Sequence, residues 1–163
     1  MTQIANFILM AKFNKLANEK IITACNKLTE IEYKKDRGAF FFSIHGTLNH
    51  LLVVDRAFIS RLEGKDHGIK SLDQILYKNL SELEEARIKE DKRLVDLVNR
   101  LSGESLTKEI TYTGFESGET TSTMNRILIT IFNHQTHHRG QVHNMLSQAG
   151  IKPPQIDIPD LII

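Results

Sequence analysis

The distribution of helix-breaking residues constrains this chain more than any other feature. All three prolines lie after position 150, and nine glycines are spread thinly over 163 residues. Proline inside a helix removes a backbone hydrogen bond and clashes with the preceding turn, so a chain without it can carry long uninterrupted helices. The first 150 residues therefore indicate a helical protein.

Apolar residues that recur at steps of three and four predict four helices, each with one inward stripe. The expected helices cover residues 2–31, 40–62, 79–101 and 123–148. In the third helix, Leu83, Ile88 and Leu94 are expected to face inward. The solvated face is expected to consist of charged side chains: Glu82, Glu85, Lys89, Lys92 and Arg93. Gly64 follows the second helix as a plausible C-cap.

Two connections complete the expected fold. Residues 64–76 are long enough to cross the end of a bundle. Residues 109–113 and 119–122, on either side of the turn 114–118, have the pattern of a short β-hairpin before the last helix. The expected fold class is an all-α four-helix bundle, forming a single domain over residues 1–163.

Charge and composition exclude several classes of function. With 21 basic and 20 acidic residues, the formal net charge is +1, which disfavours nucleic acid as a partner. No apolar run approaches the roughly 18 residues of a membrane span. The single cysteine, Cys25, excludes an intramolecular disulfide and fits a reducing compartment, so we expect a cytoplasmic protein that does not contact membranes. Cys25 itself is interpreted as a buried packing residue.

Four of the seven histidines fall within a single ten-residue stretch inside the last predicted helix: His134, His137, His138 and His143. His134 and His138 lie about 40° apart on a stripe that runs inward, whereas His143 points about 180° away from His134. Burying an imidazole costs about 1 to 3 kcal/mol unless it gains partners. The pair therefore indicates either a hydrogen-bond network or a metal site.

A metal site needs a further ligand from another helix. His50 is the best candidate, because it lies in the most apolar part of the second helix. His45 is its competitor; it is turned about 140° away from His50, so the two cannot face one site together. His67, in the glycine-flanked connection, is expected to be an exposed loop residue.

Three stretches resemble the DinB family: residues 13–18 (FNKLAN), 46–56 (GTLNHLLVVDR) and 133–141 (NHQTHHRGQ). With the tail 150–157, the resemblance spans the whole chain. It implies a divalent metal held by a histidine of the second helix and an H-x-x-x-H pair of the last, which carries over to His50, His134 and His138. It also implies a bundle with a long crossover between the second and third helices, and a homodimer. Two features depart from the family pattern: the tryptophans common in the first two helices are absent, and Thr130 stands where many relatives have another histidine.

Three neutral imidazoles would leave a divalent ion strongly Lewis-acidic, with positions open for water. We expect zinc or nickel, and a metal-dependent enzyme of the thiol-dependent transferase or hydrolase type acting on a small-molecule or thiol substrate. The alternative is a non-catalytic metal-binding protein with a structural or stress-response role. Because an imidazolium cannot ligate, metal binding is expected to weaken as the pH falls through about 7 to 6.

Polar residues near the histidines have two interpretations. Gln141 and Asn14 can orient an imidazole through its second nitrogen. Asp55 is the nearest carboxylate on the second helix, but it is expected to form an ordinary ion pair with Arg56. Arg139 is expected to be a solvated or dimer-facing charge.

Overall fold

The computed structural model describes residues 2–115 and 117–161. Within these residues, four long helices form a bundle: α1 (Gln3–Cys25), α3 (Ile44–Glu63), α4 (Leu80–Asn99) and α5 (Met124–Gln148). The remaining elements are short: α2 (Glu30–Lys34), the 3-10 turn η1 (Glu104–Thr107), the antiparallel strands β1 (Glu109–Gly114) and β2 (Gly118–Thr123), and α6 (Ile158–Leu161). The expected all-α bundle with a hairpin before its last helix is confirmed.

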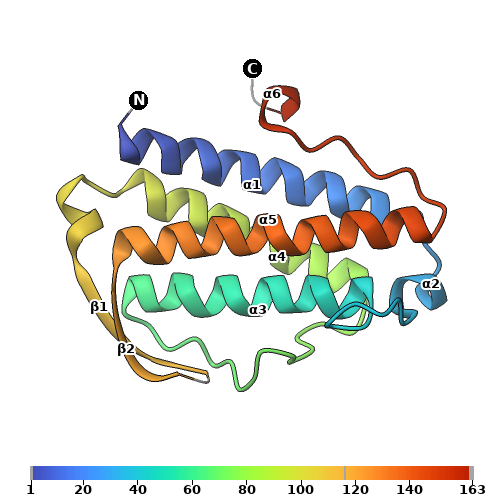
Figure 1. The fold of residues 1–163 in the computed structure, drawn as a ribbon, viewed down its shortest axis with the longest axis horizontal. Helices are drawn as coiled ribbons and strands as arrows, with labels where there is room; N and C mark the ends of the chain where they lie inside the picture. Colours follow the sequence, from blue (N-terminus) through green and yellow to red (C-terminus); the bar gives the residue numbers. More distant parts are fainter. Residues whose placement is uncertain (1, 116, 162–163) are drawn as a thin grey trace.

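Figure 1 shows that α1 and α5 run in one direction and α3 and α4 in the other. α1 packs against α4 and α5, and α3 packs against the same two helices. Because α3 and α4 point the same way, residues 64–79 return along the bundle as the expected crossover. The crossover and the β-hairpin lie on the same side of α3 (Figure 1).

Local signals set the helix boundaries, and two of them differ from the expected ranges. The first helix ends at Cys25 rather than at residue 31, because Thr29 caps a new short helix by accepting a hydrogen bond from the amide of Glu32. α3 begins after Ser43, whose hydroxyl accepts from the amide of Gly46. At its other end, Gly64 adopts a φ of 68° and forms the expected C-cap.

Two apolar clusters fill the two halves of the core. α1 places Ala11 in one cluster and Ile21 in the other, and α3 places Ile59 and Leu51 in the same two clusters, in the reverse order. Between the clusters, every long helix contributes buried polar side chains. We call this set the polar layer; it consists of Asn14, Asn18, Asp55, Arg87, Asp91, Gln135 and Arg139.

The polar layer forms a closed ring of interactions across all four helices. Asp55 accepts a hydrogen bond from Gln135 and pairs with Arg87 at 2.7 Å; Arg87 also pairs with Asp91 at 3.0 Å. The side-chain amide of Asn18 donates a hydrogen bond to Asp91, also at 3.0 Å. Arg139 closes the ring by donating to the side-chain oxygens of Asn18, Gln135 and Asn14. Two carboxylates and two guanidinium groups thus balance each other inside the core.

The polar layer corrects two expectations about charged residues. Arg139 is 2% exposed rather than solvated, because three side-chain oxygens and the ring of Phe13 surround its guanidinium group. Asp55 does not pair with Arg56; it is fully buried against Arg87, whereas Arg56 pairs with Glu90 at 3.3 Å.

Four of the five charged residues expected on the solvated face of the third helix are exposed: Glu82, Glu85, Lys89 and Lys92. Arg87, Glu90 and Asp91 are buried, while Ile88, expected to face inward, is 49% exposed. Partners on the neighbouring helices satisfy the charges, so the stripe that faces the core is partly polar.

Among the described residues, none of the helices combines the length and the hydrophobicity that crossing a membrane requires.

Candidate metal centre

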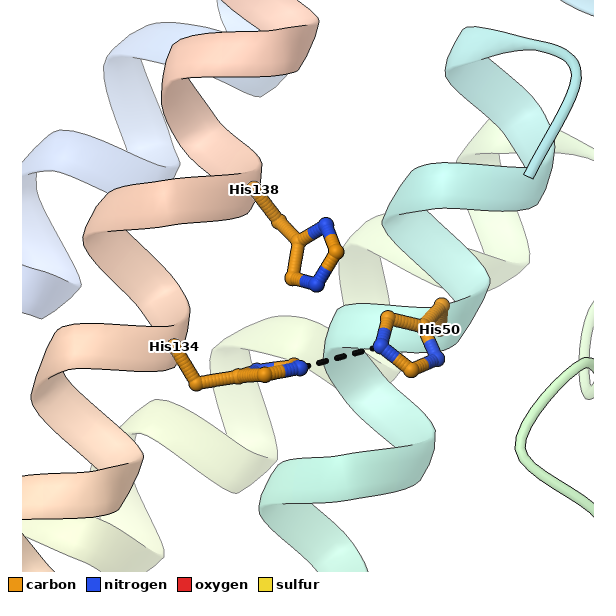
Figure 2. A group of neighbouring side chains, drawn as sticks. All are labelled: His50, His134 and His138. Atoms are coloured by element: carbon orange, nitrogen blue, oxygen red, sulfur yellow. Dashed lines mark hydrogen bonds between the residues drawn. The ribbon is translucent and has the colours of Figure 1, made fainter. Parts of the chain in front are cut away.

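The three predicted histidines meet between α3 and α5. His50 projects from α3, and His134 and His138 project from successive turns of α5, so that the three rings face one another (Figure 2). One ring nitrogen from each residue lies within 4.8 Å of the others, and Nε2 of His50 is 2.9 Å from Nε2 of His134. This group of three imidazoles could hold a metal ion.

Hydrogen bonds on the outer side orient two of the rings. Nδ1 of His50 lies 2.8 Å from the carbonyl oxygen of Leu72, in the crossover. Nδ1 of His138 lies 2.7 Å from Oε1 of Gln141. Both partners are acceptors, so each Nδ1 carries the proton and each Nε2 keeps its lone pair. Such outer contacts fix the tautomer that metal ligation requires.

The third ring, His134, has a different environment. Its Nδ1 is buried without a hydrogen-bond partner in the part of the chain that the structure describes. Its Nε2 faces Nε2 of His50, which already presents a lone pair. Two lone pairs repel at this separation, so either a proton on His134 or a cation bound by both nitrogens must satisfy them.

Burial keeps the three rings uncharged. Burial, with a smaller contribution from the neighbouring imidazoles, lowers the pKa of His50 to about 4 and that of His134 to about 3. Burial also lowers the pKa of His138. The cluster therefore offers three neutral nitrogen donors at pH 7, the form that binds metal ions.

Phe41 covers the cluster from one side. Its ring stacks on His50, with centroids 3.7 Å apart and 20° between the planes, and it meets His138 edge-on. A tight turn before α3 holds it there, with Phe42 at a φ of 63°. Gly46 makes room for this turn, since a Cβ at that position would overlap the carbonyl oxygen of Phe41. Sequence reasoning missed Phe41; the run of three phenylalanines before the Ser43 cap was the available signal.

A cavity of about 430 Å³ opens beside the histidines. His50 and His134 form part of its wall, and residues of the crossover and the β-hairpin line other parts of it. Its lining is mainly apolar and aromatic, with Arg61 and Ser117 as further polar residues. Among the described residues that line this cavity, none is acidic.

The other histidines have different partners. Nε2 of His45 lies 2.9 Å from the carbonyl oxygen of Tyr77, and Nε2 of His143 lies 3.2 Å from that of Pro154. His137 is exposed and touches His138 edge-on. His67, expected to be exposed, is half-buried near Phe115. Within residues 2–115 and 117–161, none of these four joins the group of three.

Of the described polar residues expected near the histidines, only one contacts a ring of the cluster. Gln141 orients His138, as the sequence suggested, whereas Asn14 contacts Arg139 in the polar layer rather than an imidazole. Asp55 also lies in the polar layer and does not line the cavity. Cys25 is fully buried, and burial raises its pKa to about 12, so it is a packing residue as expected.

The fold and the cluster define a class of protein: a four-helix bundle in which two neighbouring helices bring three imidazoles together beside a pocket. The chain matches the DinB family over residues 1–162 and belongs to this family. It is 29% identical over 148 residues to Protein DinB of Bacillus subtilis (strain 168), covering 85% of this chain and 83% of that protein. Its structure is similar to that of a DinB-like protein from Bacillus cereus ATCC 10987, with a TM-score of 0.67 and 19% identity over 87% of this chain and 91% of the other. The similarity to the Bacillus cereus structure supports the assignment of the fold.

Proposed function

We propose that the protein binds one divalent metal ion through His50, His134 and His138 and acts as a metal-dependent enzyme. One observation carries the proposal: three neutral imidazoles converge from two helices, and two of them are held with Nε2 directed toward the common centre. Zinc and nickel both suit an all-imidazole donor set.

The surroundings of the cluster favour catalysis over a purely structural ion. Three protein ligands leave coordination positions open, as in catalytic rather than structural zinc sites. His50 and His134 also line the cavity, so an open position there is accessible to a small molecule. When bound, the ion would lower the pKa of a water or thiol and stabilise the resulting anion.

The residues of the cavity favour a thiol over water as the nucleophile. Asp55, the nearest carboxylate expected from sequence, is occupied by Arg87 and Gln135. None of the described lining residues is acidic, so none of them can supply a carboxylate as a general base. A thiol ionises far more readily than water. We therefore favour a thiol-dependent transferase over a hydrolase.

Metal content of protein purified without a histidine tag or chelating resin tests the proposal. Elemental mass spectrometry is expected to find about one equivalent of a divalent metal per chain, lost in His50→Ala, His134→Ala and His138→Ala. His143→Ala is the matched control and is expected to retain the metal. Absence of metal from the wild-type protein, even after reconstitution with zinc or nickel, would overturn the proposal.

Activity assays distinguish a catalytic role of the bound ion from a non-catalytic one. Metal-loaded protein is screened for transfer of a thiol to an electrophile and for ester hydrolysis, with His134→Ala as the blank. Thiol transfer that depends on the metal supports the proposed reaction class. A tightly bound metal with neither activity would favour the non-catalytic alternative.

A further inference from the structure

Arg61 lies on the same face of α3 as His50. His50, Val54, Ala57 and Arg61 follow one another at steps of four and three, and all four line the cavity beside the histidines. Eleven residues of helix separate His50 from Arg61, about 16 Å along the axis. The arginine side chain leans toward the N-terminal end of its helix, which shortens that gap.

Aromatic rings hold the guanidinium group of Arg61 in the cavity wall. Its central carbon lies 4.5 Å from the ring centroid of Tyr112, 5.1 Å from that of Phe58 and 5.2 Å from that of Phe115. One nitrogen donates to the carbonyl oxygen of Thr113 at 2.9 Å. Such packing leaves a long, flexible side chain with little freedom, so the group is already in place for a ligand.

Arg61 has few hydrogen-bond partners among the residues that the structure describes. Among the described residues, the contact with Thr113 is its one hydrogen bond, and no carboxylate lies within ion-pair distance of it. A guanidinium group carries five N–H donors and stays charged at neutral pH. The arginines of the polar layer, in contrast, are matched by Asp55 and Asp91.

The described residues that line the cavity carry charge of one sign. The described lining residues include Arg61 and two neutral imidazoles but no acid, so Arg61 is the only formal charge among them. The stretch between its two polar ends is apolar, formed by Val54, Ala57 and Phe58. An anion that reaches Arg61 can form charge-assisted hydrogen bonds with it beside this apolar wall.

We propose that Arg61 determines substrate specificity by binding a carboxylate or phosphate group. The substrate is then an elongated small molecule with its reacting group at the histidines, an uncharged middle section, and an anion at the far end. This inference rests on the proposed function, because the histidine end of the cavity must hold the reacting group. The competing role for Arg61 is structural: fixing the β-hairpin through Thr113 and the aromatic rings.

A matched pair of metal-binding probes distinguishes these roles. Octanohydroxamic acid ends in a methyl group, and suberic acid monohydroxamate ends in a carboxylate; both carry the same chelating head. Isothermal titration of the zinc-loaded protein is expected to show about tenfold tighter binding of the carboxylate probe. An apolar pocket without an anion subsite would favour the methyl group instead. A third probe with a terminal phosphonate shows which anion is preferred.

Variants test whether the preference for the carboxylate probe depends on Arg61. Arg61→Met is expected to remove the preference while leaving the affinity for octanohydroxamic acid unchanged, and Arg61→Lys is expected to keep part of it. Arg126→Met changes the net charge equally at an exposed position of α5 and is expected to keep it in full. Equal binding of the two probes to the wild type, or equal weakening of both in Arg61→Met, would overturn the inference.

A titration of the metal-free protein makes the test independent of the metal site. Octanoate is expected to shift the side-chain Nε signal of Arg61 in ¹⁵N spectra and to leave that of Arg126 in place. If zinc does not bind but this shift is seen, the proposed function fails and the anion site stands. If octanohydroxamic acid binds the zinc-loaded protein while no preference and no shift are seen, the metal site stands and the anion site fails.

Discussion

The phenyl ring of Phe41 lies almost parallel to the imidazole of His50, with their centroids 3.7 Å apart. Two segments outside the bundle thus hold this imidazole: the turn before α3 covers one face of the ring, and the crossover accepts a hydrogen bond from Nδ1 through the carbonyl oxygen of Leu72. Burial of the imidazole lowers its pKa, and the hydrogen bond to Leu72 opposes this shift only in part.

Replacing Phe41 by alanine is expected to raise the pKa of His50 in the metal-free protein. The value should move from about 4 toward the ordinary value of about 6.5, because water then reaches one face of the ring and stabilises its charged form. NMR titration of the histidine ring protons measures the change. Phe40→Ala is the control, since this side chain is 81% exposed. An unchanged pKa of His50 in Phe41→Ala would mean that the stack does not cause the shift.

The pH dependence of metal binding should differ from that of an exposed histidine cluster. Protons compete with the metal only below the pKa of each free ligand, and burial lowers all three values. At pH 6 an exposed trio with pKa values near 6.5 would release about two protons per ion. Here we expect fewer than one, with affinity lost as the pH falls from 6 toward 3. Calorimetry in two buffers of different ionisation enthalpy counts the protons, and a release of two at pH 6 would contradict this prediction.

Gln141 is expected to support metal affinity without binding the metal. Its Oε1 accepts from Nδ1 of His138 and fixes the orientation of that ring. Gln141→Leu should weaken zinc binding by about 10- to 100-fold, the usual effect of losing such an outer contact. Asn144→Leu, one turn along α5 on its exposed side, should leave the affinity unchanged. Competition with a chromogenic chelator measures both, and equal affinities in the two variants would show that His138 needs no such support.

Arg87 is expected to be the most costly charged residue to remove. Arg87→Leu leaves Asp55 and Asp91 buried without their cation, a loss of about 3 to 5 kcal/mol in the free energy of unfolding. The loss should shrink at acid pH, where the two carboxyl groups, whose pKa values burial already raises, take up protons. Lys92→Ala removes an exposed pair with Asp96 and should cost at most about 1 kcal/mol. Urea unfolding compares the two variants, and similar costs would contradict the prediction.

The sequence predicted the parts of the structure that depend on local periodicity. The i, i+4 spacing places His134 and His138 on one inward face, because it fixes their directions once the helix is known. The apolar neighbours of His50 favour it over His45, and the structure brings His50 to the same place as the pair on α5.

Contacts that depend on the path of a loop or on several helices together could not be predicted in this way. Phe41 and Leu72 reach His50 from a turn and a crossover whose routes follow from packing. Arg87 and Arg139 look like surface residues, because their carboxylate and amide partners lie on other helices. A charged side chain on an amphipathic helix is usually solvated, and only the tertiary structure shows the compensation.

The residues of the polar layer, which hold the fold together, are different from the residues that form the site. The ring of the polar layer ties all four helices together through Asp55, Arg87 and Arg139 and includes none of the three histidines. A descendant of this chain could therefore exchange each imidazole for another side chain and still fold as the same bundle. The pocket would remain in place, so that a new function could evolve in it while the bundle stays unchanged.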